Sequence, residues 1–367
     1  MVSGVRLKNL QLEIQPQKVD AVLISRVANI TYLTGYSGFS TEEREAFLLI
    51  TPQQQLIFTD GRYSEAVKKL LPDFRLVEIG GGKKFKDLLK EETGNLKITK
   101  LGIEEDDLKV SEFKQIKKVI RFLKDFKFHQ QRSLKTDAEV SLIEKACEIG
   151  DLAFKFILTK IKAGISEKEL AYYLENFIRV QGFESSFKTI IAFGENSAVP
   201  HHQTGEARLK SGDFVLMDFG VRFKNYCSDM TRTVVFGRAS QKQKKIYQTV
   251  KESQEKAAEF LKKKIQHPAP GVGVLAKDVD RTARQYILGQ GFPSIPHSLG
   301  HGIGIEVHEH PYLSPNSQET LKEGMVFSIE PGIYIPGFGG VRIEDLYVLE
   351  SNGIRQLTDS PKEFIEI

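Results

Sequence analysis

Residues 212–237, GDFVLMDFGVRFKNYCSDMTRTVVFG, constrain the fold of this chain more than any other stretch. An apolar run and a run rich in β-branched residues predict two strands joined by a turn. Each strand carries an aspartate, Asp218 and Asp229, where an apolar residue would pack more easily. Because side chains alternate between the faces of a strand, only a particular register places both carboxylates on one side. Carboxylates held together there repel each other, and a divalent cation between them would relieve that cost.

The length of 367 residues predicts two domains, because it exceeds what one ordinary core supports. Residues 1–130 alternate strand and helix patterns, which predicts a small α/β domain that ends in a helix at residues 111–127. Residues 131–367 contain two Ser/Thr-x-x-Glu capping boxes that open helices, and a Pro/Gly-rich turn at residues 267–271 between two further helices. With the strands and loops that follow, this half is expected to be α+β, with a curved, mostly antiparallel sheet.

Composition excludes several classes of function. The formal net charge is +4 and no Lys/Arg block is interleaved with aromatic residues, so a nucleic-acid surface is not indicated. No apolar run approaches membrane-spanning length, and the N-terminus lacks the pattern of a signal peptide. Two cysteines, Cys147 and Cys227, lie far apart and imply no disulfide framework. These features predict a cytoplasmic globular protein that binds neither nucleic acid nor membrane.

Three further positions place ligand-type side chains within apolar patterns: His301 among glycines, Glu330 at the end of one run, and Glu344 inside another. Each of them, like each aspartate, has a plain interpretation by itself, such as a satisfied core histidine or a carboxylate that faces water. Together, two Asp, one His and two Glu without a required thiolate suit Mn²⁺, Co²⁺, Fe²⁺ or Zn²⁺. Five ligands exceed one open tetrahedral site and suit two metals that share carboxylates.

The order and setting of these residues resemble a known family. The motifs MDFG, SDMTRT, SLGHGIG, IEPG and VRIEDL are similar to those of the creatinase/aminopeptidase P/prolidase family of pita-bread metallopeptidases. Residues 28–35 and 59–63 resemble the N-terminal domain of that family, so the resemblance spans essentially the whole chain. It implies an α/β creatinase-like N-terminal domain at residues 1–130 and an α+β pita-bread catalytic domain at residues 131–367.

The resemblance also implies a role for each ligand. Asp218 would chelate one divalent ion, and His301 and Glu330 the other. Asp229 and Glu344 would bridge both ions, for which Mn²⁺ is expected first and Co²⁺, Zn²⁺ or Fe²⁺ are alternatives. Two such ions activate a water for attack on the scissile carbonyl, and Glu330 would also serve as the general base.

Further catalytic groups are expected outside the ligand set. His201, His297 and His308 are candidates to protonate the leaving amine or to stabilise the developing oxyanion. Arg342 stands two residues before Glu344, and it would share that strand face and hold the bridging carboxylates in place.

The family resemblance implies cleavage of the bond between an N-terminal residue and a following proline. A dipeptidase must also bind a free C-terminal carboxylate, normally with an arginine or another cation. The loop at residues 311–322 carries Lys322 as its one positive charge, which favours an Xaa-Pro aminopeptidase over an Xaa-Pro dipeptidase, or prolidase. Methionine aminopeptidase ranks third, because it usually lacks such an N-terminal domain.

A protein of another class would be a catalytically silent binding module on the same scaffold, but the five intact ligands argue against it. The expected partners are peptides with proline at the second position and a second copy of the chain in a homodimer.

Overall fold

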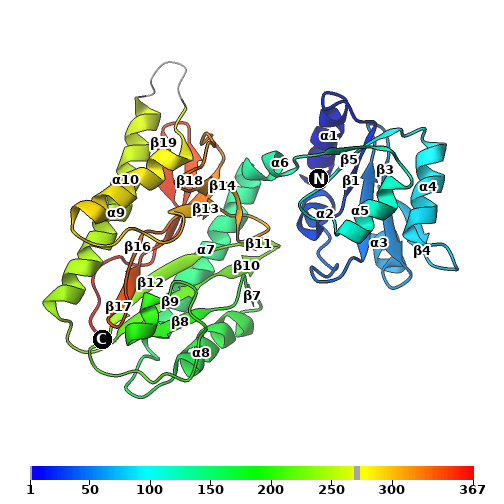
Figure 1. Cartoon of the computed structure of the whole chain (residues 1–367). Coiled ribbons are helices and arrows are strands. Elements are labelled where there is room, and N and C mark those ends of the chain that lie inside the picture. Colours follow the sequence, from blue (N-terminus) through cyan, green and yellow to red (C-terminus); the bar gives the residue numbers. More distant parts are fainter. Residues whose placement is uncertain (1, 268–272) are drawn as a thin grey trace. The chain divides into compact units, whose positions relative to one another are not determined.

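The computed structural model describes residues 2–267 and 273–367. It divides into two compact units, Met1–Gln131 and Arg132–Ile367 (Figure 1). The turn expected at residues 267–271 falls, apart from its first residue, outside the described residues. Within the described parts of the chain, no helix has the length and apolar character needed to cross a membrane.

The first unit is built on one six-stranded sheet. Its strands are β1 (Ala21–Ile24), β2 (Ala46–Ile50), β3 (Gln55–Asp60), β4 (Arg75–Ile79), β5 (Lys100–Ile103) and β6 (Phe122–Asp125). Their order is β4-β3-β2-β1-β5-β6, with β2 antiparallel to both of its neighbours and the other pairs parallel. The helices are α1 (Val2–Ile14), α2 (Val27–Thr34), α3 (Ser64–Leu70), α4 (Phe85–Asn95) and α5 (Val110–Lys117). Every residue of β1 and β2 is buried, as expected for strands covered on both faces.

The single helix predicted at residues 111–127 is wrong. Helix α5 ends at Lys117, and the chain then forms the edge strand β6. The apolar spacing fitted a helix, but β6 pairs in parallel with β5, with Leu123 opposite Leu101. This pairing gives the backbone of residues 122–125 hydrogen-bond partners that the local sequence pattern does not reveal.

The short helix α6 (His129–Ser133) leads into the second unit, whose elements are more numerous. Its longer helices are α7 (Asp137–Leu158), α8 (Glu167–Val180), α9 (Gln241–Gln266) and α10 (Ala276–Gly289), and a 3₁₀ helix, η1, spans Gly194–Ala198. The strands of its first half are β7 (Glu184–Ser185), β8 (Ile190–Phe193), β9 (Phe214–Phe219), β10 (Val221–Phe223), β11 (Tyr226–Cys227) and β12 (Met230–Val235). The strands of its second half are β13 (Gly300–Gly302), β14 (Glu309–Leu313), β15 (Val326–Ile329), β16 (Gly332–Ile335), β17 (Gly339–Arg342), β18 (Asp345–Glu350) and β19 (Gly353–Gln356).

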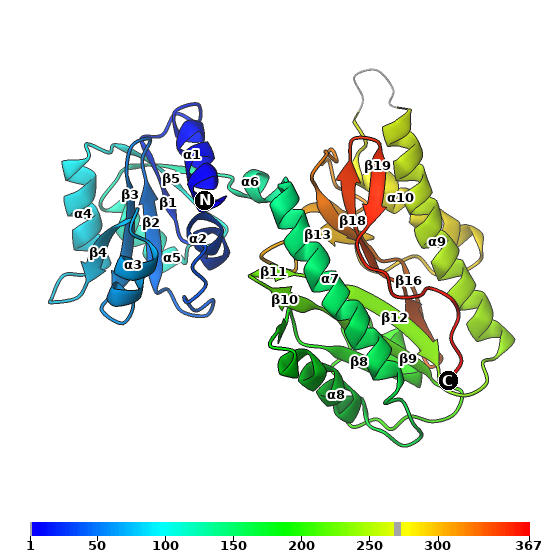
Figure 2. The ribbon, with the colours of Figure 1, turned by 180° about the vertical axis from the view of Figure 1, so that it is seen from behind.

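The strands of the second unit pair antiparallel in four sheets. The orders are β12-β9-β8, β11-β10-β7, β14-β13-β15-β18-β19 and β16-β17. Figures 1 and 2 show helices α7 and α8 along one side of these strands and α9 and α10 along the other. One buried apolar cluster joins α7 and α8 to β8, β9 and β12, and another joins α9 and α10 to the second-half strands. The predicted fold classes, α/β and α+β, are confirmed.

Both capping boxes predicted for the second unit are confirmed. At the start of α7, Thr136 N–H donates to the carboxylate of Glu139 at 2.9 Å, and Glu139 N–H donates to Thr136 Oγ1 at 3.4 Å. The same reciprocal pair opens α8 between Ser166 and Glu169. These caps satisfy amide groups that the first turn of each helix leaves without a partner.

The segment at residues 212–237 contains more strands than predicted. Strands β9 and β12 are neighbours in one sheet, with Asp218 opposite Thr231. In the sequence, β10 and β11 lie between them, and Asp229 stands just before β12 rather than within it. Gly220 separates β9 from β10, which belong to different sheets, and a Cβ atom there would lie 1.9 Å from the carbonyl oxygen of Ser228. A side chain therefore cannot occupy this position, and the segment is not a simple two-stranded hairpin.

Candidate metal centre

The side chains singled out in the sequence converge on one cavity of the second unit, with a volume of about 330 Å³. The predicted metal ligands that line it are Asp218, Asp229, His301, Glu330 and Glu344. The other predicted site residues that line it are His201, His297, His308 and Arg342. An apolar wall completes the cavity and includes Phe187, Ile190, Pro200, Val307 and Tyr312.

Strands and strand ends hold the acidic groups and the histidine in place. Asp218 lies on β9 and His301 on β13, Glu330 follows β15, and Glu344 links β17 to β18. Position 300, before His301, requires glycine, because a Cβ atom there would lie 2.0 Å from the carbonyl oxygen of Ser328 on the neighbouring strand β15. Close backbone approach, as the glycine-rich sequence suggests, thus brings β13 against β15.

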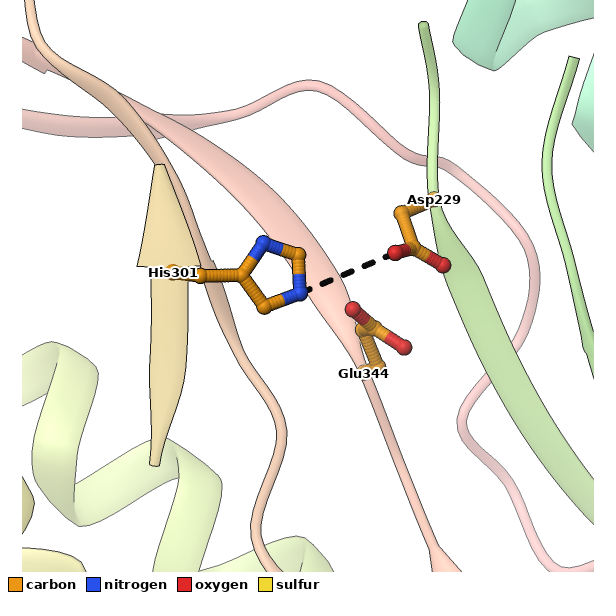
Figure 3. Close-up of side chains that lie close together, drawn as sticks. All are labelled: Asp229, His301 and Glu344. Atoms are coloured by element: carbon orange, nitrogen blue, oxygen red, sulfur yellow. Dashed lines mark ion pairs between the residues drawn. The ribbon is translucent and has the colours of Figure 1, made fainter. Parts of the chain in front are cut away.

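Three of these side chains form a compact group in Figure 3. One ligand atom from each of Asp229, His301 and Glu344 lies within 4.8 Å of the other two. Nε2 of His301 is 3.7 Å from Oδ2 of Asp229 and 3.2 Å from Oε1 of Glu330. All of these residues are largely buried, so their charges are poorly screened by water.

The residues present fit a divalent cation. Oδ1 of Asp229 and Oε1 of Glu344 are buried and have no hydrogen-bond partner among the described residues. Burial raises the pKa of both carboxyl groups well above their ordinary values, and the negative charges of neighbouring carboxylates raise it further. Buried polar atoms without partners are costly, and a cation placed between these oxygens would remove both penalties. Oxygen and imidazole donors are also the ligands that Mn²⁺ and similar ions accept.

Arg342 reaches two of the proposed ligands, Asp218 directly and Glu344 through a threonine. Its Nη2 donates to Oδ2 of Asp218, and its Nε donates to the hydroxyl of Thr231 at 3.0 Å. Thr231 in turn donates to Oε2 of Glu344 at 2.7 Å, so Arg342 reaches this carboxylate only through the threonine. The expected shared strand face does not occur, because β17 ends at Arg342, but Arg342 still supports the carboxylate of Glu344 through Thr231.

Glu330 and His301 form a second hydrogen-bonded pair. Burial by itself would raise the pKa of Glu330, but the hydrogen bond and charge of His301, with the charges of His297 and Arg342, lower it to about 2. Burial would lower the pKa of His301, and the hydrogen bond and charge of Glu330 instead raise it to about 9. The hydroxyl of Ser328 donates to Oε1 of Glu330 and accepts the backbone N–H of His301, both at 3.0 Å.

Two other histidines, His297 and His308, occupy distinct places around the cavity. Nδ1 of His297 is 2.7 Å from the carbonyl oxygen of Ser298, which can only accept, so this nitrogen carries a proton. Its Nε2 is 2.9 Å from the hydroxyl of Tyr334. The ring of His308 packs edge-on against His301, with centroids 4.4 Å apart. Burial lowers the pKa of both His297 and His308, which favours their neutral forms at neutral pH.

Sequence reasoning missed three side chains that support the site: Thr231, Ser328 and Tyr334. Thr231 stands two residues after Asp229, and Ser328 stands two residues before Glu330. Strand alternation around the proposed ligands could therefore have suggested the first two. Tyr334 lies on β16, and nothing in its sequence spacing indicates that its hydroxyl joins His297 to Nη1 of Arg342.

Comparisons with known proteins agree with this architecture. Residues 6–132 match the model of the Creatinase/Prolidase N-terminal domain, and residues 141–351 match that of metallopeptidase family M24. An Xaa-Pro dipeptidase of Pyrococcus horikoshii is 36% identical over 377 aligned positions, which cover 99% of each chain. The solved Xaa-Pro dipeptidase from Bacillus anthracis is 35% identical, covers 100% of both chains and has a TM-score of 0.89. The solved X-Pro aminopeptidase from Thermotoga maritima is 35% identical, with coverage of 95% of this chain and 98% of that chain and a TM-score of 0.83.

Antiparallel strands that direct carboxylates and a histidine into one cavity, inside two pairs of helices, define a metallopeptidase with the pita-bread fold. The chain belongs to metallopeptidase family M24 and carries the Creatinase/Prolidase N-terminal domain. Membership of this family implies divalent metal ions, in agreement with the donor set described above.

Proposed function

We propose that the protein is an Xaa-Pro dipeptidase that uses two divalent metal ions. The observation that carries this proposal is the pair of buried, unpartnered oxygens on Asp229 and Glu344 beside Nε2 of His301. Asp229 and Glu344 would be shared between the two ions. Asp218 would complete one set of ligands, and His301 with Glu330 would complete the other.

Ions bound in such a site polarise the scissile carbonyl and lower the pKa of a coordinated water. The chain itself moves the protons. Glu330 is ionised at neutral pH, since its pKa is lowered, and its carboxylate can accept the proton of the attacking water. His308 and His201 line the same cavity and are proposed to donate hydrogen bonds to the developing oxyanion or a proton to the leaving proline nitrogen. His297 lines it too, but its one proton is directed to Ser298, so it is proposed to accept a hydrogen bond from the hydroxyl of Tyr334 rather than to act as a donor.

Two observations support a dipeptide substrate. The relatives named Xaa-Pro dipeptidase align over 98% of this chain or more, so the alignments span both domains. The cavity volume of about 330 Å³ lies near the lower end of the range of about 300–1,000 Å³ for small-molecule sites, which suits a small substrate. These two observations outweigh the sequence argument for an aminopeptidase, which rested on one loop. They support an Xaa-Pro dipeptidase better.

An Xaa-Pro aminopeptidase remains the second candidate, because Tyr312 and no arginine lines the cavity from the loop at residues 311–322. An arginine there would offer a C-terminal carboxylate two parallel hydrogen bonds. A peptide that extends beyond the proline has no carboxylate at this position, and it would not need that cation. The X-Pro aminopeptidase from Thermotoga maritima has the same fold, so the fold does not separate the two activities.

Peptide length separates the two candidates experimentally. The metal-free protein would be reconstituted with Mn²⁺, Co²⁺, Zn²⁺ or Fe²⁺ and assayed on Ala-Pro and on Ala-Pro-containing tri- to pentapeptides. We expect kcat/KM to be highest for the dipeptide, with activity lost on chelation and restored by metal. Turnover confined to the longer peptides would assign the aminopeptidase, and a protein that binds no divalent ion and cleaves none of these peptides would overturn the proposal.

Three further properties belong to the proposal. Mn²⁺ is the first expected ion because most of the ligands are carboxylates, which suit hard ions. A homodimer is expected from the family resemblance. A cytoplasmic location is supported by Cys147 and Cys227, which are both buried and unpaired, as is usual in a reducing compartment.

A further inference from the structure

A glutamine on helix α9 connects two segments that carry proposed metal ligands. Gln254 is fully buried, and its side-chain Nε2 donates to the carbonyl oxygen of Ile329 at 2.9 Å and to that of Ile343 at 3.3 Å. Ile329 immediately precedes Glu330, and Ile343 immediately precedes Glu344. One side-chain amide thus contacts the backbone directly before two of the five ligands.

The orientation of this amide is determined by its surroundings. Besides the two carbonyl oxygens, Nε2 lies 3.1 Å from Oδ2 of Asp345, so three acceptors surround it. On the other side, Nζ of Lys362 donates to Oε1 of Gln254 at 3.2 Å. The reverse orientation would place a carbonyl oxygen against three oxygens and an NH₂ group against an ammonium, so it is excluded.

The contacts of Gln254 fix whole peptide groups. The carbonyl of Ile329 and the N–H of Glu330 belong to one planar unit, and that N–H donates to the carbonyl oxygen of Leu299 at 2.8 Å. The carbonyl of Ile343 shares a peptide group with the N–H of Glu344, which donates to the carbonyl oxygen of Thr231 at 3.1 Å. Each of the two peptide groups is therefore hydrogen-bonded at both its carbonyl oxygen and its N–H.

Because the orientation of a peptide plane sets the direction in which the following Cα–Cβ bond points, Gln254 acts on both carboxylates at once. Glu330 directly follows Ile329 of β15, and Glu344 directly precedes Asp345 of β18, and Ile329 and Asp345 lie opposite each other in the five-stranded sheet. The β15–β18 pairing therefore brings the two segments together. Gln254 adds hydrogen bonds from helix α9 to the last carbonyl oxygen before each carboxylate.

We propose that Gln254 is a positioning residue for the metal centre, which holds Glu330 and Glu344 at the separation that two divalent ions require. This inference rests on the proposed dinuclear metal site. Groups that orient metal ligands without touching the metal typically account for about 10–100-fold in affinity or activity. The expected effect of losing the amide is a decrease of that size in affinity for Mn²⁺.

The test compares Gln254→Met with Ser253→Ala in the full chain. Methionine preserves length and buried volume but removes the donor. Ser253 is the preceding residue of α9, is also fully buried, and donates to the carbonyl oxygen of Ala283 at 3.0 Å, away from the proposed ligands. Both variants lose buried hydrogen bonds from the same helix, so the control accounts for a general loss of stability.

The readouts are calorimetric titration of each metal-free protein with MnCl₂ and kcat for Ala-Pro at saturating Mn²⁺. We expect Mn²⁺ affinity to fall about 10–100-fold in Gln254→Met and less than about threefold in Ser253→Ala. Equal affinity in Gln254→Met and wild type would overturn the inference while leaving the proposed function intact. A wild-type protein that binds no Mn²⁺ would instead overturn the proposed function.

Gln254→Glu provides a second, sharper comparison. The carboxylate has the same shape, but it places an acceptor against the carbonyl oxygens of Ile329 and Ile343 and against Asp345. We expect a larger loss of Mn²⁺ affinity than in Gln254→Met, and affinity equal to wild type would contradict the inference. If this variant does not fold, Gln254→Ala replaces it, with the same expectation as for methionine.

Discussion

Arg232 and Asp345 form an ion pair in the interior of the second unit, with Nη2 of the guanidinium 2.6 Å from Oδ1 of the carboxylate. Their side chains are 1% and 0% exposed. The pair lies next to the metal centre in the chain, since Asp345 follows Glu344 directly, and Nη1 of Arg232 donates to the carbonyl oxygen of Glu344. A buried charge that loses its partner is strongly destabilising, so this pair is expected to control the stability of the surrounding strands.

Replacing Asp345 by asparagine is expected to lower the free energy of unfolding by about 3–5 kcal/mol, because it leaves the guanidinium of Arg232 buried without its counter-charge. The measurement is urea denaturation of the metal-free protein followed by circular dichroism. Asp60→Asn is the matched control, because the Arg62–Asp60 pair is largely exposed and should contribute less than about 1 kcal/mol. Similar losses in the two variants would contradict the argument.

Glu309 should make the stability of the protein sensitive to acid. Burial would raise the pKa of this carboxyl group, but the charges of Arg132 and Lys135 more than offset it and lower the pKa below the ordinary value. A carboxyl group with a lowered folded-state pKa stabilises the protein above its unfolded pKa of about 4.3, and this contribution is lost as pH falls through the folded pKa.

Glu309→Gln tests this sign. The variant should be less stable than wild type at pH 7. The difference should shrink progressively below about pH 4.3, where Glu309 of the unfolded wild-type chain becomes protonated, and be lost below the lowered pKa of the folded state. Thermal unfolding of both proteins from pH 7 to pH 3 provides the measurement. A stability difference that stays constant over this range would show that the charge of Glu309 is not responsible.

Glu330→Gln is expected to reduce kcat for Ala-Pro by at least about 100-fold, the usual minimum contribution of a general base. The amide keeps the shape of the side chain but cannot accept a proton from water. Retained secondary structure by circular dichroism would separate a chemical effect from unfolding. Ser328→Ala removes only one hydrogen bond to this carboxylate and should have a smaller effect, so turnover near the wild-type rate in Glu330→Gln would remove Glu330 from the proposed mechanism.

Divalent metal should raise the thermal stability of the protein. The carboxylates of Asp229 and Glu344 repel each other in the folded chain, and ligand binding at 100 times the dissociation constant stabilises a protein by about 2.7 kcal/mol. Adding MnCl₂ to metal-free protein should therefore raise Tm, and EDTA should reverse the change. Glu344→Gln should weaken the response to Mn²⁺, and an unchanged response in this variant would exclude Glu344 as a ligand.

Sequence patterns predicted the fold class, and the resemblance to a known family predicted the residues that meet in the cavity, because each proposed ligand stands in one of the motifs that carry the resemblance. They predicted local geometry less well. Asp229 was expected within a strand, but the close approach at Gly220 and the two added strands depend on packing between segments. The strand β6 was expected as helix because its pairing with β5 involves residues about twenty positions away.

The supporting side chains show the limit of sequence reasoning most clearly. Gln254 lies in the sequence VKESQEKAAEF, where several polar residues follow each other on a long helix. Helical spacing places Gln254 on the same face of α9 as Val250, Ala257 and Leu261, whereas Gln248 bonds Glu252 on the exposed side. The spacing thus indicates that Gln254 is buried, but only the arrangement of strands around α9 determines that its amide meets the backbone beside Glu330 and Glu344.

The hydroxyl of Thr231 has one hydrogen, and the structure leaves it a single direction. Because Nε of Arg342 already donates to this oxygen, the hydrogen must point to Glu344. The hydrogen bonds therefore run in one direction, from the guanidinium of Arg342 through the hydroxyl of Thr231 to the carboxylate of Glu344. Thr231 presents its hydrogen, rather than a lone pair, to this carboxylate. The other oxygen of Glu344 has no hydrogen-bond partner among the described residues and is the one that would face a bound cation, so a neutral threonine determines which atom of a charged neighbour is available for chemistry.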